Sequence, residues 1–158
     1  MKANPKSEEF KAKYPLLFRE GCLRSGFHLP AGWYPLVERL CSSIENQLTH
    51  FVPEEIRGEV YVVQVKEKFG GLRFYMNVGT PYIDGAISLA ESLSYITCEE
   101  CGNSGELRKN GYLRVLCNKD YAISKEQIKE SNKKYLEEQK ERTKQKKLQR
   151  LLEESLKK

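Results

Sequence analysis

Apolar residues between Pro35 and Phe51 recur three or four positions apart, which is the spacing of a helix that buries one face. Pro35 stands at the start of this pattern, where a proline fits the first turn of a helix. The residues on the apolar face are Leu36, Val37, Leu40, Cys41, Ile44, Leu48 and Phe51. The pattern predicts an amphipathic helix, and it favours Cys41 as a core residue over a ligand or a nucleophile.

The chain before this helix has weaker signals. A short helix is predicted from about Ser7, and Pro15 is expected to kink or end it. The residues expected to pack are Phe10, Leu17 and Phe18. Residues 21–32 have the composition of a loop, and Trp33 then stands at the helix entry, where it either anchors a partner or packs into the core as a staple. Packing into the core is the favoured alternative.

The apolar period changes to two in the segment E-V-Y-V-V-Q-V-K-E-K-F-G-G-L-R-F-Y-M-N-V. Because β-branched and aromatic residues dominate and two glycines interrupt them, the segment predicts a hairpin with strands near 59–66 and 71–78. Thr80 and Pro81 are then expected to cap and open a second amphipathic helix. The residues of this helix that can face the sheet are Ile83, Ala86, Ile87, Ala90 and Leu93.

Two further elements are predicted towards the C-terminus. Asn110-Gly111 stands between the segments E-L-R and Y-L-R-V-L, which indicates a second, small hairpin. From Ile123 onward the chain is rich in Lys and Glu, and Ser124 with Gln127 has the spacing of a capping box. A projecting, solvated helix of about 50 Å is predicted there. Its apolar residues do not sustain a coiled-coil heptad.

The formal charge of +5 is unevenly placed along the 158 residues. Residues 1–122 contain fifteen Lys and Arg and fifteen Asp and Glu, whereas residues 123–158 contain twelve and seven. The whole excess therefore lies in the tail, and composition does not require a basic patch on the folded body. No apolar run reaches the roughly 18 residues that cross a bilayer, and no secretion signal is evident, so we expect a cytoplasmic protein. In that setting the five cysteines predict reduced thiols or metal ligands.

The strongest chemical signal is the pairing of Cys98-x-x-Cys101 with Cys117-x-x-Asp120, separated by fifteen residues. This separation is close to that of two half-sites in a small zinc module. A C-x-x-C turn points two thiolates at one ion, and the predicted hairpin returns the chain so that the second pair arrives opposite. Zinc is the favoured metal because most of the ligands are thiolates.

Three states of this cluster are open from sequence alone. Asp120 closes a Cys3Asp site, or water takes the fourth position as in catalytic centres, or the cysteines merely pack. The closed site is favoured, because three thiolates donate so much charge that a bound water would be poorly acidified. Packing alone is disfavoured by the small and polar residues after Cys101, whose backbone amides we expect to donate hydrogen bonds to the thiolates. These residues are Gly102, Asn103, Ser104 and Gly105.

Catalytic constellations are not evident elsewhere in the sequence. The two histidines, His28 and His50, lie far upstream of the cysteines, and each is expected to be a surface or helix-end residue. No Ser-His-Asp order, Cys-His pair or cluster of carboxylates stands out. The sequence therefore favours binding over catalysis.

The segment K-E-K-F-G-G-L-R-F-Y has two interpretations. Its aromatic residues could stack on a nucleic-acid single strand while its cations neutralise phosphates. The residues assigned to such a binding surface are Lys66, Lys68, Arg73 and Tyr75, with Phe69 and Phe74 as further stacking residues. Alternatively the segment is a tight turn with Phe69, Leu72 and Phe74 buried and the charges solvated. The second interpretation is favoured.

Together the patterns predict an α+β fold: helices packed on a small antiparallel sheet, a treble-clef-like zinc unit and a long charged C-terminal helix. The predicted divisions are an α+β core domain at residues 1–97, a zinc-binding unit at 98–122 packed on the core, and a charged helical tail at 123–158.

Four blocks of the sequence resemble a family of uncharacterised bacteriophage and prophage proteins. The blocks are Y-P-L-L-F-R-E, G-W-Y-P-L-V-E-R-L-C, Q-V-K-E-K-F-G-G-L-R-F-Y, and C-E-E-C-G-N-S-G with its later C-N-K-D, and they span about Tyr14 to Ala122. The resemblance implies a Cys3His-like zinc site, and this chain has Asp120 where relatives carry a histidine. The resemblance also implies that the protein is encoded by a phage and is located in the cytoplasm of the bacterial host, but it implies no activity.

Three functions are compatible with these observations. The favoured one is a phage-encoded, non-catalytic zinc-binding protein that binds and modulates a host or phage protein, such as a defence or nucleic-acid-processing system. The second is a nucleic-acid-binding zinc protein that uses Lys66, Lys68, Arg73 and the tail. The third is a metal-dependent enzyme that acts on nucleic acid, and it requires an open coordination position at the metal.

Overall fold

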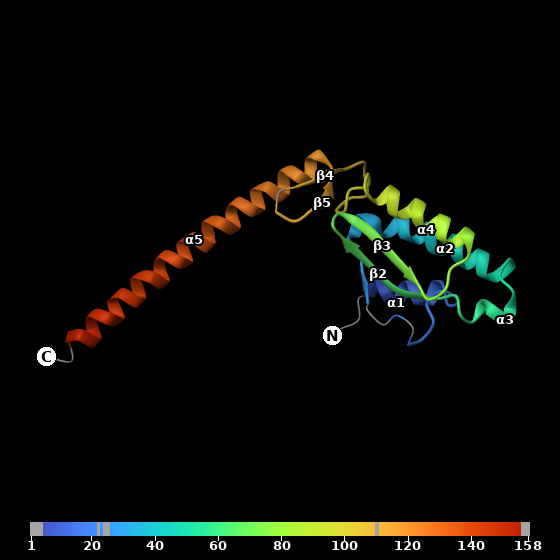
Figure 1. The fold of residues 1–158 in the computed structure, drawn as a ribbon. Helices are drawn as coiled ribbons and strands as arrows, with labels where there is room; N and C mark the ends of the chain where they lie inside the picture. The colour runs from blue at the N-terminus through green and yellow to red at the C-terminus, as the bar shows by residue number, and fades with distance from the viewer. Residues whose placement is uncertain (1–4, 22, 24–25, 110, 156–158) are drawn as a thin grey trace. The chain divides into compact units, whose positions relative to one another are not determined.

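The computed structural model confirms the α+β fold and describes residues 5–21, 23, 26–109 and 111–155 (Figure 1). Contacts within the chain separate two units, Met1–Asp120 and Tyr121–Lys158. The first unit contains both sheets and all of the shorter helices. The second consists of the remainder of the C-terminal helix. The predicted division of the first unit near residue 97 stays a prediction.

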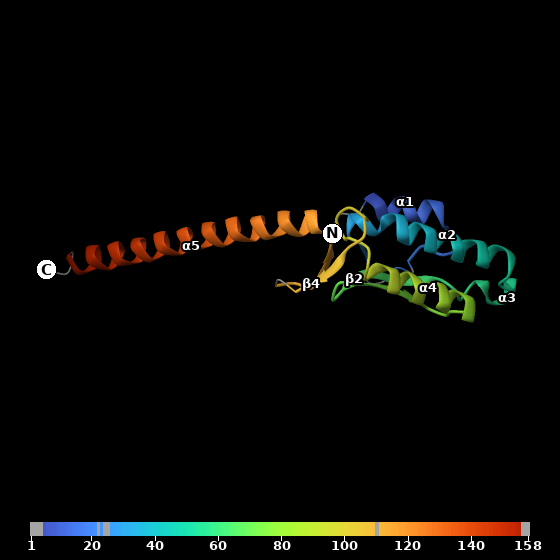
Figure 2. The ribbon, with the colours of Figure 1, turned by 90° about the horizontal axis from the view of Figure 1, so that it is seen from above.

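Helices α1 (Pro5–Lys13) and α2 (Tyr34–His50) cover one face of the larger sheet (Figures 1 and 2). Their apolar faces are buried because they meet the sheet, and the ring centroids of Phe10 and Phe27 lie 5.0 Å apart in this core. Leu36 is partly buried, and the other predicted packing residues that are buried are Phe10, Leu17, Phe18, Val37, Leu40, Cys41, Ile44 and Leu48. Phe51 was wrongly placed on this face, because α2 ends at His50 and the Phe51 side chain is 68% exposed.

The helix entry confirms the prediction made for Trp33. This residue ends a short 3-10 helix, η1 (Ala31–Trp33), and its side chain is fully buried. The indole Nε1–H donates a hydrogen bond of 2.8 Å to the carbonyl of Thr97. Trp33 therefore packs in the core, and the alternative of an exposed partner anchor is wrong.

The larger sheet has the order β1-β2-β3. The predicted hairpin is confirmed as β2 (Val62–Lys68) and β3 (Gly71–Met76), which pair antiparallel. Strand β1 (Phe27–His28) pairs parallel to β2, in a segment that the sequence predicted as loop. Two residues are too few to show a periodicity, so only the long-range pairing identifies this strand. The sheet is therefore mixed rather than purely antiparallel.

Helix α4 (Pro81–Ser94) lies along α2 and along the outer edge of β3. Its predicted N-cap is confirmed, because the Thr80 side chain accepts a hydrogen bond from the amide of Ile83. Ser94 Oγ and Glu91 Oε1 accept hydrogen bonds from two outward-facing amides of β3. Helix α4 thus covers a strand edge that would otherwise be open to pairing.

Two details of this region differ from prediction. Leu93 was expected to face the sheet, but it is 37% exposed because it points to the groove between α2 and α4. A one-turn helix, α3 (Glu54–Arg57), follows Pro53 and was not predicted. Ile83, Ala86, Ile87 and Ala90 contact the core as expected.

The second hairpin is confirmed as β4 (Glu106–Arg108) and β5 (Arg114–Leu116). Its connection spans residues 109–113; Asn110 lies outside the described residues, and Gly111 has φ +84°. Helix α5 (Asn118–Ser155) begins five residues before the predicted Ile123. Its 38 residues correspond to about 57 Å. Between residues 122 and 150 nearly all of its side chains are exposed, as expected for a solvated helix.

None of the helices in the described part of the chain combines the length and the apolar character that a membrane span requires.

Candidate metal centre

The first pair of candidate ligands lies on a tight loop that follows α4. The amide of Gly102 donates to the carbonyl of Cys98 at 2.9 Å, and the amide of Cys98 donates to the carbonyl of Asn103 at 2.7 Å. Gly102 has φ +76°, which lets the backbone turn sharply after Cys101. These bonds close a knuckle that turns the Cys98 and Cys101 thiols towards the same point.

The second pair lies where strand β5 gives way to α5. Cys117 precedes the first residue of the helix, and its sulfur accepts a hydrogen bond of 3.4 Å from the amide of Asp120. This is the position and the bond of a helix N-cap, and the partial positive charge of the helix N-terminus favours an anionic sulfur there. Because the helix starts at Asn118, Asp120 is held in its first turn and faces the knuckle.

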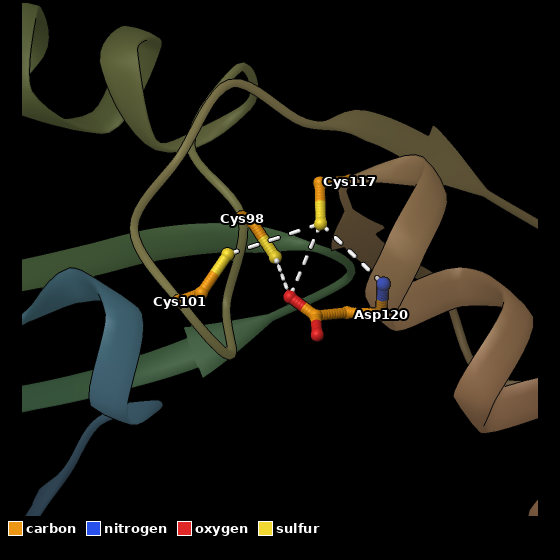
Figure 3. A group of neighbouring side chains, drawn as sticks. All are labelled: Cys98, Cys101, Cys117 and Asp120. Atoms are coloured by element: carbon orange, nitrogen blue, oxygen red, sulfur yellow. Dashed lines mark hydrogen bonds between the residues drawn. The ribbon is translucent and has the colours of Figure 1, made fainter.

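The four side chains converge (Figure 3). One ligand atom from each of Cys98, Cys101, Cys117 and Asp120 lies within 4.8 Å of the others. The sulfurs of Cys101 and Cys117 are 3.8 Å apart. Two thiolates bound to zinc at about 2.3 Å and at the tetrahedral angle would be separated by about 3.8 Å. Asp120 Oδ2 lies 3.2 Å from the sulfur of Cys98 and 3.1 Å from that of Cys117.

The protonation of the cluster follows from this packing. Hydrogen bonds from the thiols of Cys101, Cys117 and Cys98 hold the pKa of the Asp120 carboxyl below its usual value. The neighbouring Asp120 carboxylate in turn raises the pKa of Cys101 to about 12. The Asp120 carboxylate therefore favours the protonated form of the Cys101 thiol when no cation is bound. A divalent ion would reverse this balance and bind three thiolates and a carboxylate.

A second layer of residues fixes the knuckle to the rest of the unit. Gly32 donates its amide to the carbonyl of Glu99 at 2.7 Å, and a Cβ on Gly32 would lie 2.2 Å from the carbonyl oxygen of Cys98. The Glu99 side chain is buried and accepts hydrogen bonds from the amide of Val115 and from Arg114. Burial raises the pKa of Glu99, while these hydrogen bonds act against that rise. The knuckle is thus attached to both η1 and β5.

Sequence reasoning missed these supporting residues. Gly32 lies 66 positions before Cys98, and nothing in its local sequence links it to the cysteines. Glu99 appeared as one of two adjacent glutamates in C-E-E-C, and only the structure separates the buried one from the exposed Glu100. An acidic residue between two cysteines was the one available signal.

One expectation about the knuckle holds only in part, because a backbone hydrogen bond from Asn103 acts on the Cys101 thiol and acts to lower its pKa, while the two glycine amides have other acceptors. The amides of Gly102 and Gly105 were expected to donate to thiolates, but they donate to the carbonyls of Cys98 and Ile96. The side-chain amide of Asn103 instead lies 3.4 Å from the sulfur of Cys101. The donors to sulfur are therefore Asn103, through its backbone and its side chain, and the first turn of α5, rather than the two glycines.

The remaining sequence candidates lie apart from the cluster. Across the described residues, the three cysteines and Asp120 are the only group of His, Cys, Asp and Glu that could hold a metal ion such as zinc. His28 and His50 are exposed and do not belong to it. The hairpin residues predicted to bind nucleic acid are on the larger sheet: Lys66, Lys68, Arg73 and Tyr75.

Comparisons with protein-family models, with curated proteins and with solved structures find no match to this chain. The resemblance to a phage and prophage family therefore remains an expectation from the sequence, and function is inferred from the site itself.

Proposed function

We propose that the protein binds one zinc ion in a closed Cys3Asp site and that the ion is structural. The convergence of four ligand atoms within 4.8 Å, with two sulfurs at the separation of a tetrahedral zinc site, carries this proposal. Thiolate ligands favour zinc over magnesium or calcium. Zinc would join the knuckle to the start of α5 and reinforce the hydrogen bonds that already tie the knuckle to β5 through Glu99.

The proposed role is binding rather than catalysis. Asp120 occupies the position where a catalytic centre would keep water, and its carboxylate contacts two of the three thiols. Three thiolates also lower the Lewis acidity of the ion, so a bound water would be a weak nucleophile. A metal-dependent enzyme would need Asp120 to leave the ion and open a coordination position.

The proposed partner is a protein, and helix α4 offers a surface for it. An apolar stripe runs along its exposed side and consists of Tyr82, Leu89, Leu93 and the following Ile96. Between α4 and α2 lies a groove of about 190 Å³, floored by Leu40 and Ala90 and edged by Arg39. Such a groove fits one apolar face of a partner helix, with an acidic residue opposite Arg39. In the setting implied by the resemblance, the partner would be a host or phage protein in the bacterial cytoplasm.

Metal analysis tests the zinc site. We expect one zinc per chain in the wild type, and less than about a tenth of that in Cys101→Ser, because a missing thiolate weakens a structural zinc site strongly. Cys101 is exposed, so this change removes no core packing. Cys41→Ala is the matched control, since Cys41 is buried and not a ligand, and it should retain one zinc. A stable, metal-free wild type would rule out the zinc proposal.

Cobalt substitution tests whether the site is closed. Tetrahedral cobalt with three thiolates has strong visible absorption, and Asp120→Ala should change that spectrum because water replaces the carboxylate. An unchanged spectrum would show that Asp120 is not a ligand and would favour the open site.

Affinity capture with a designed variant tests the partner surface. Leu89→Glu places a charge on the stripe, and Leu148→Glu makes the same change at a similarly exposed leucine of α5. We expect a partner protein that stays bound after nuclease treatment. It should bind the wild type and Leu148→Glu but not Leu89→Glu, and the purified partner should bind the purified wild type directly. Equal binding by all three proteins would exclude the α4 stripe, and self-association lost in Leu89→Glu would identify a second copy as the occupant instead.

A further inference from the structure

The face of the larger sheet that α1 and α2 leave uncovered carries a row of like charges. Lys66 on β2 stands directly opposite Arg73 on β3. Like charges opposite one another in a sheet are destabilising. Lys68 follows on the same side of β2, two residues on. Such a row indicates a surface that is stabilised when an anion binds it.

These cations have no carboxylate partner within the described part of the chain. Lys66 lies 5.5 Å from the ring centroid of Tyr75, and Lys68 lies 5.3 Å from that of Phe69. Arg73 donates hydrogen bonds to the hydroxyl of Tyr95 and to the carbonyl of Leu72. No ion pair involving Lys66, Lys68 or Arg73 is present among the residues that the structure describes. Lys66 and Lys68 are therefore available to an anionic ligand, and Arg73 adds its positive charge beside them although two of its nitrogens already have acceptors.

Phe69 lies at the tip of this hairpin, in a backbone conformation that a bulky residue rarely adopts. It forms the two-residue turn with Gly70, and the φ angles are +56° for Phe69 and +74° for Gly70. Two positive φ values define a type I′ turn, in which Asn-Gly is strongly preferred. A bulky residue there is strained by about 1 kcal/mol or more. Its side chain is also 63% exposed, so packing does not compensate the strain.

A groove continues from this tip towards the second hairpin. It has a volume of about 460 Å³ and is lined by Phe69, by Tyr112, which is 91% exposed, and by Arg114. The two carboxylates that line it already have partners. Glu67 accepts a hydrogen bond from the amide of Gly70, and Glu99 accepts hydrogen bonds from the Arg114 side chain and from the amide of Val115. The groove therefore exposes aromatic rings, and both of its carboxylates already accept hydrogen bonds from the protein.

The geometry points to a binding surface for single-stranded nucleic acid along this hairpin. Lys66, Lys68 and Arg73 contact successive phosphates, and bases stack on Phe69, Tyr75 and Tyr112. Cations alternating with exposed rings are what a sequence-tolerant single-strand site requires. The tight turn with Leu72 and Phe74 buried is confirmed, but Phe69 was wrongly expected to be buried; Phe69 can therefore stack on a base, whereas Phe74 cannot. The inference goes beyond the proposed function, because the sheet contains none of the metal ligands and none of the α4 stripe.

Fluorescence anisotropy with labelled oligothymidylate and oligouridylate of equal length tests the inference on the full chain. We expect both to bind, with an affinity that falls steeply as salt is raised. The variant with Lys66, Lys68 and Arg73 all changed to Ala should reduce the slope of log K against log salt by about 2, because three phosphate contacts are lost at about 0.7 each. The charge-matched control changes Lys144, Lys146 and Lys147 of α5 to Ala and should retain most of the slope.

Phe69→Asn separates a binding role from a structural one. Asn suits the positive φ of a type I′ turn, so the variant should unfold at the same temperature or higher. It should nevertheless bind the oligonucleotides about tenfold more weakly, because one stacking platform is lost. Phe51→Asn is the matched control, since Phe51 is similarly exposed and lies outside this face, and it should bind like the wild type.

Several results would overturn the inference. The inference is wrong if the wild type does not bind the oligonucleotides at low salt, or if Phe69→Asn binds them as tightly as the wild type. It is also wrong if the α5 variant loses binding and the hairpin variant does not. The zinc content of each variant is measured in parallel. Because the hairpin variants keep every metal ligand, they should retain one zinc, so failure of the nucleic-acid inference and failure of the zinc proposal are distinguishable.

Discussion

Replacing Gly32 with Ala should damage the metal centre from 66 positions away in the sequence. A Cβ at this position would lie 2.2 Å from the carbonyl oxygen of Cys98, 2.5 Å from the amide nitrogen of Gly102 and 2.8 Å from the carbonyl oxygen of Glu99. All three atoms belong to the backbone of the knuckle, so no flexible side chain can move aside. The methyl group must therefore push the knuckle away from η1.

The loss of folding stability in Gly32→Ala has two contributions. Overpacking at a rigid contact destabilises a protein by about 1–3 kcal/mol. The hydrogen bond from the Gly32 amide to Glu99, now 2.7 Å long, would also be stretched, at a cost of about 1 kcal/mol. We expect the free energy of unfolding of Gly32→Ala to fall by about 2–4 kcal/mol. Because Cys98 moves with the knuckle, zinc affinity should fall by about 10- to 100-fold, as for other changes in the support of metal ligands.

Urea unfolding of the zinc-loaded protein and competition with a chromophoric chelator measure these two quantities. Gly85→Ala is the matched control, because Gly85 lies in helix α4 with no atom within 4 Å of the added Cβ. That change should stabilise the protein by up to about 1 kcal/mol through helix propensity. If Gly32→Ala matched the wild type in both measurements, the close approach of η1 to the knuckle would be refuted.

Three further predictions concern the metal site and the core. Asp120→His should keep one zinc and bind it at least as tightly as the wild type, because imidazole completes a Cys3His site, and chelator competition measures the difference. Trp33→Phe should lower the free energy of unfolding in urea by about 2–3 kcal/mol, because the carbonyl of Thr97 loses its donor and a buried ring shrinks. Burial raises the pKa of Cys41 well above its usual value, so this thiol should stay protonated at neutral pH and react with a thiol reagent only on unfolding. Peptide mapping after timed labelling checks this, and rapid labelling of Cys41 in the native protein would contradict its burial.

Local patterns predicted most of the secondary structure. The 3.6-residue period from Leu36 to Leu48 predicted α2, and the charge pattern of the tail predicted most of α5. Both could be predicted locally because a helix forms its backbone hydrogen bonds within its own segment. The spacing of the two cysteine pairs likewise identified the four residues that the structure brings together, because a knuckle and a hairpin are short-range structures. The missed elements were β1, η1 and α3, which are too short to carry a period.

The sequence by itself thus determined which segments are helices and hairpins and which side chains could share a metal ion, since both depend on residues near one another in the chain. Only the tertiary structure decided that Gly32 supports the knuckle, that Phe69 is exposed, and that β1 pairs with β2. Each of these depends on contacts or on a backbone angle set by pairing between distant segments. Burial and opposition across strands are properties of the assembled fold, and no local pattern encodes them.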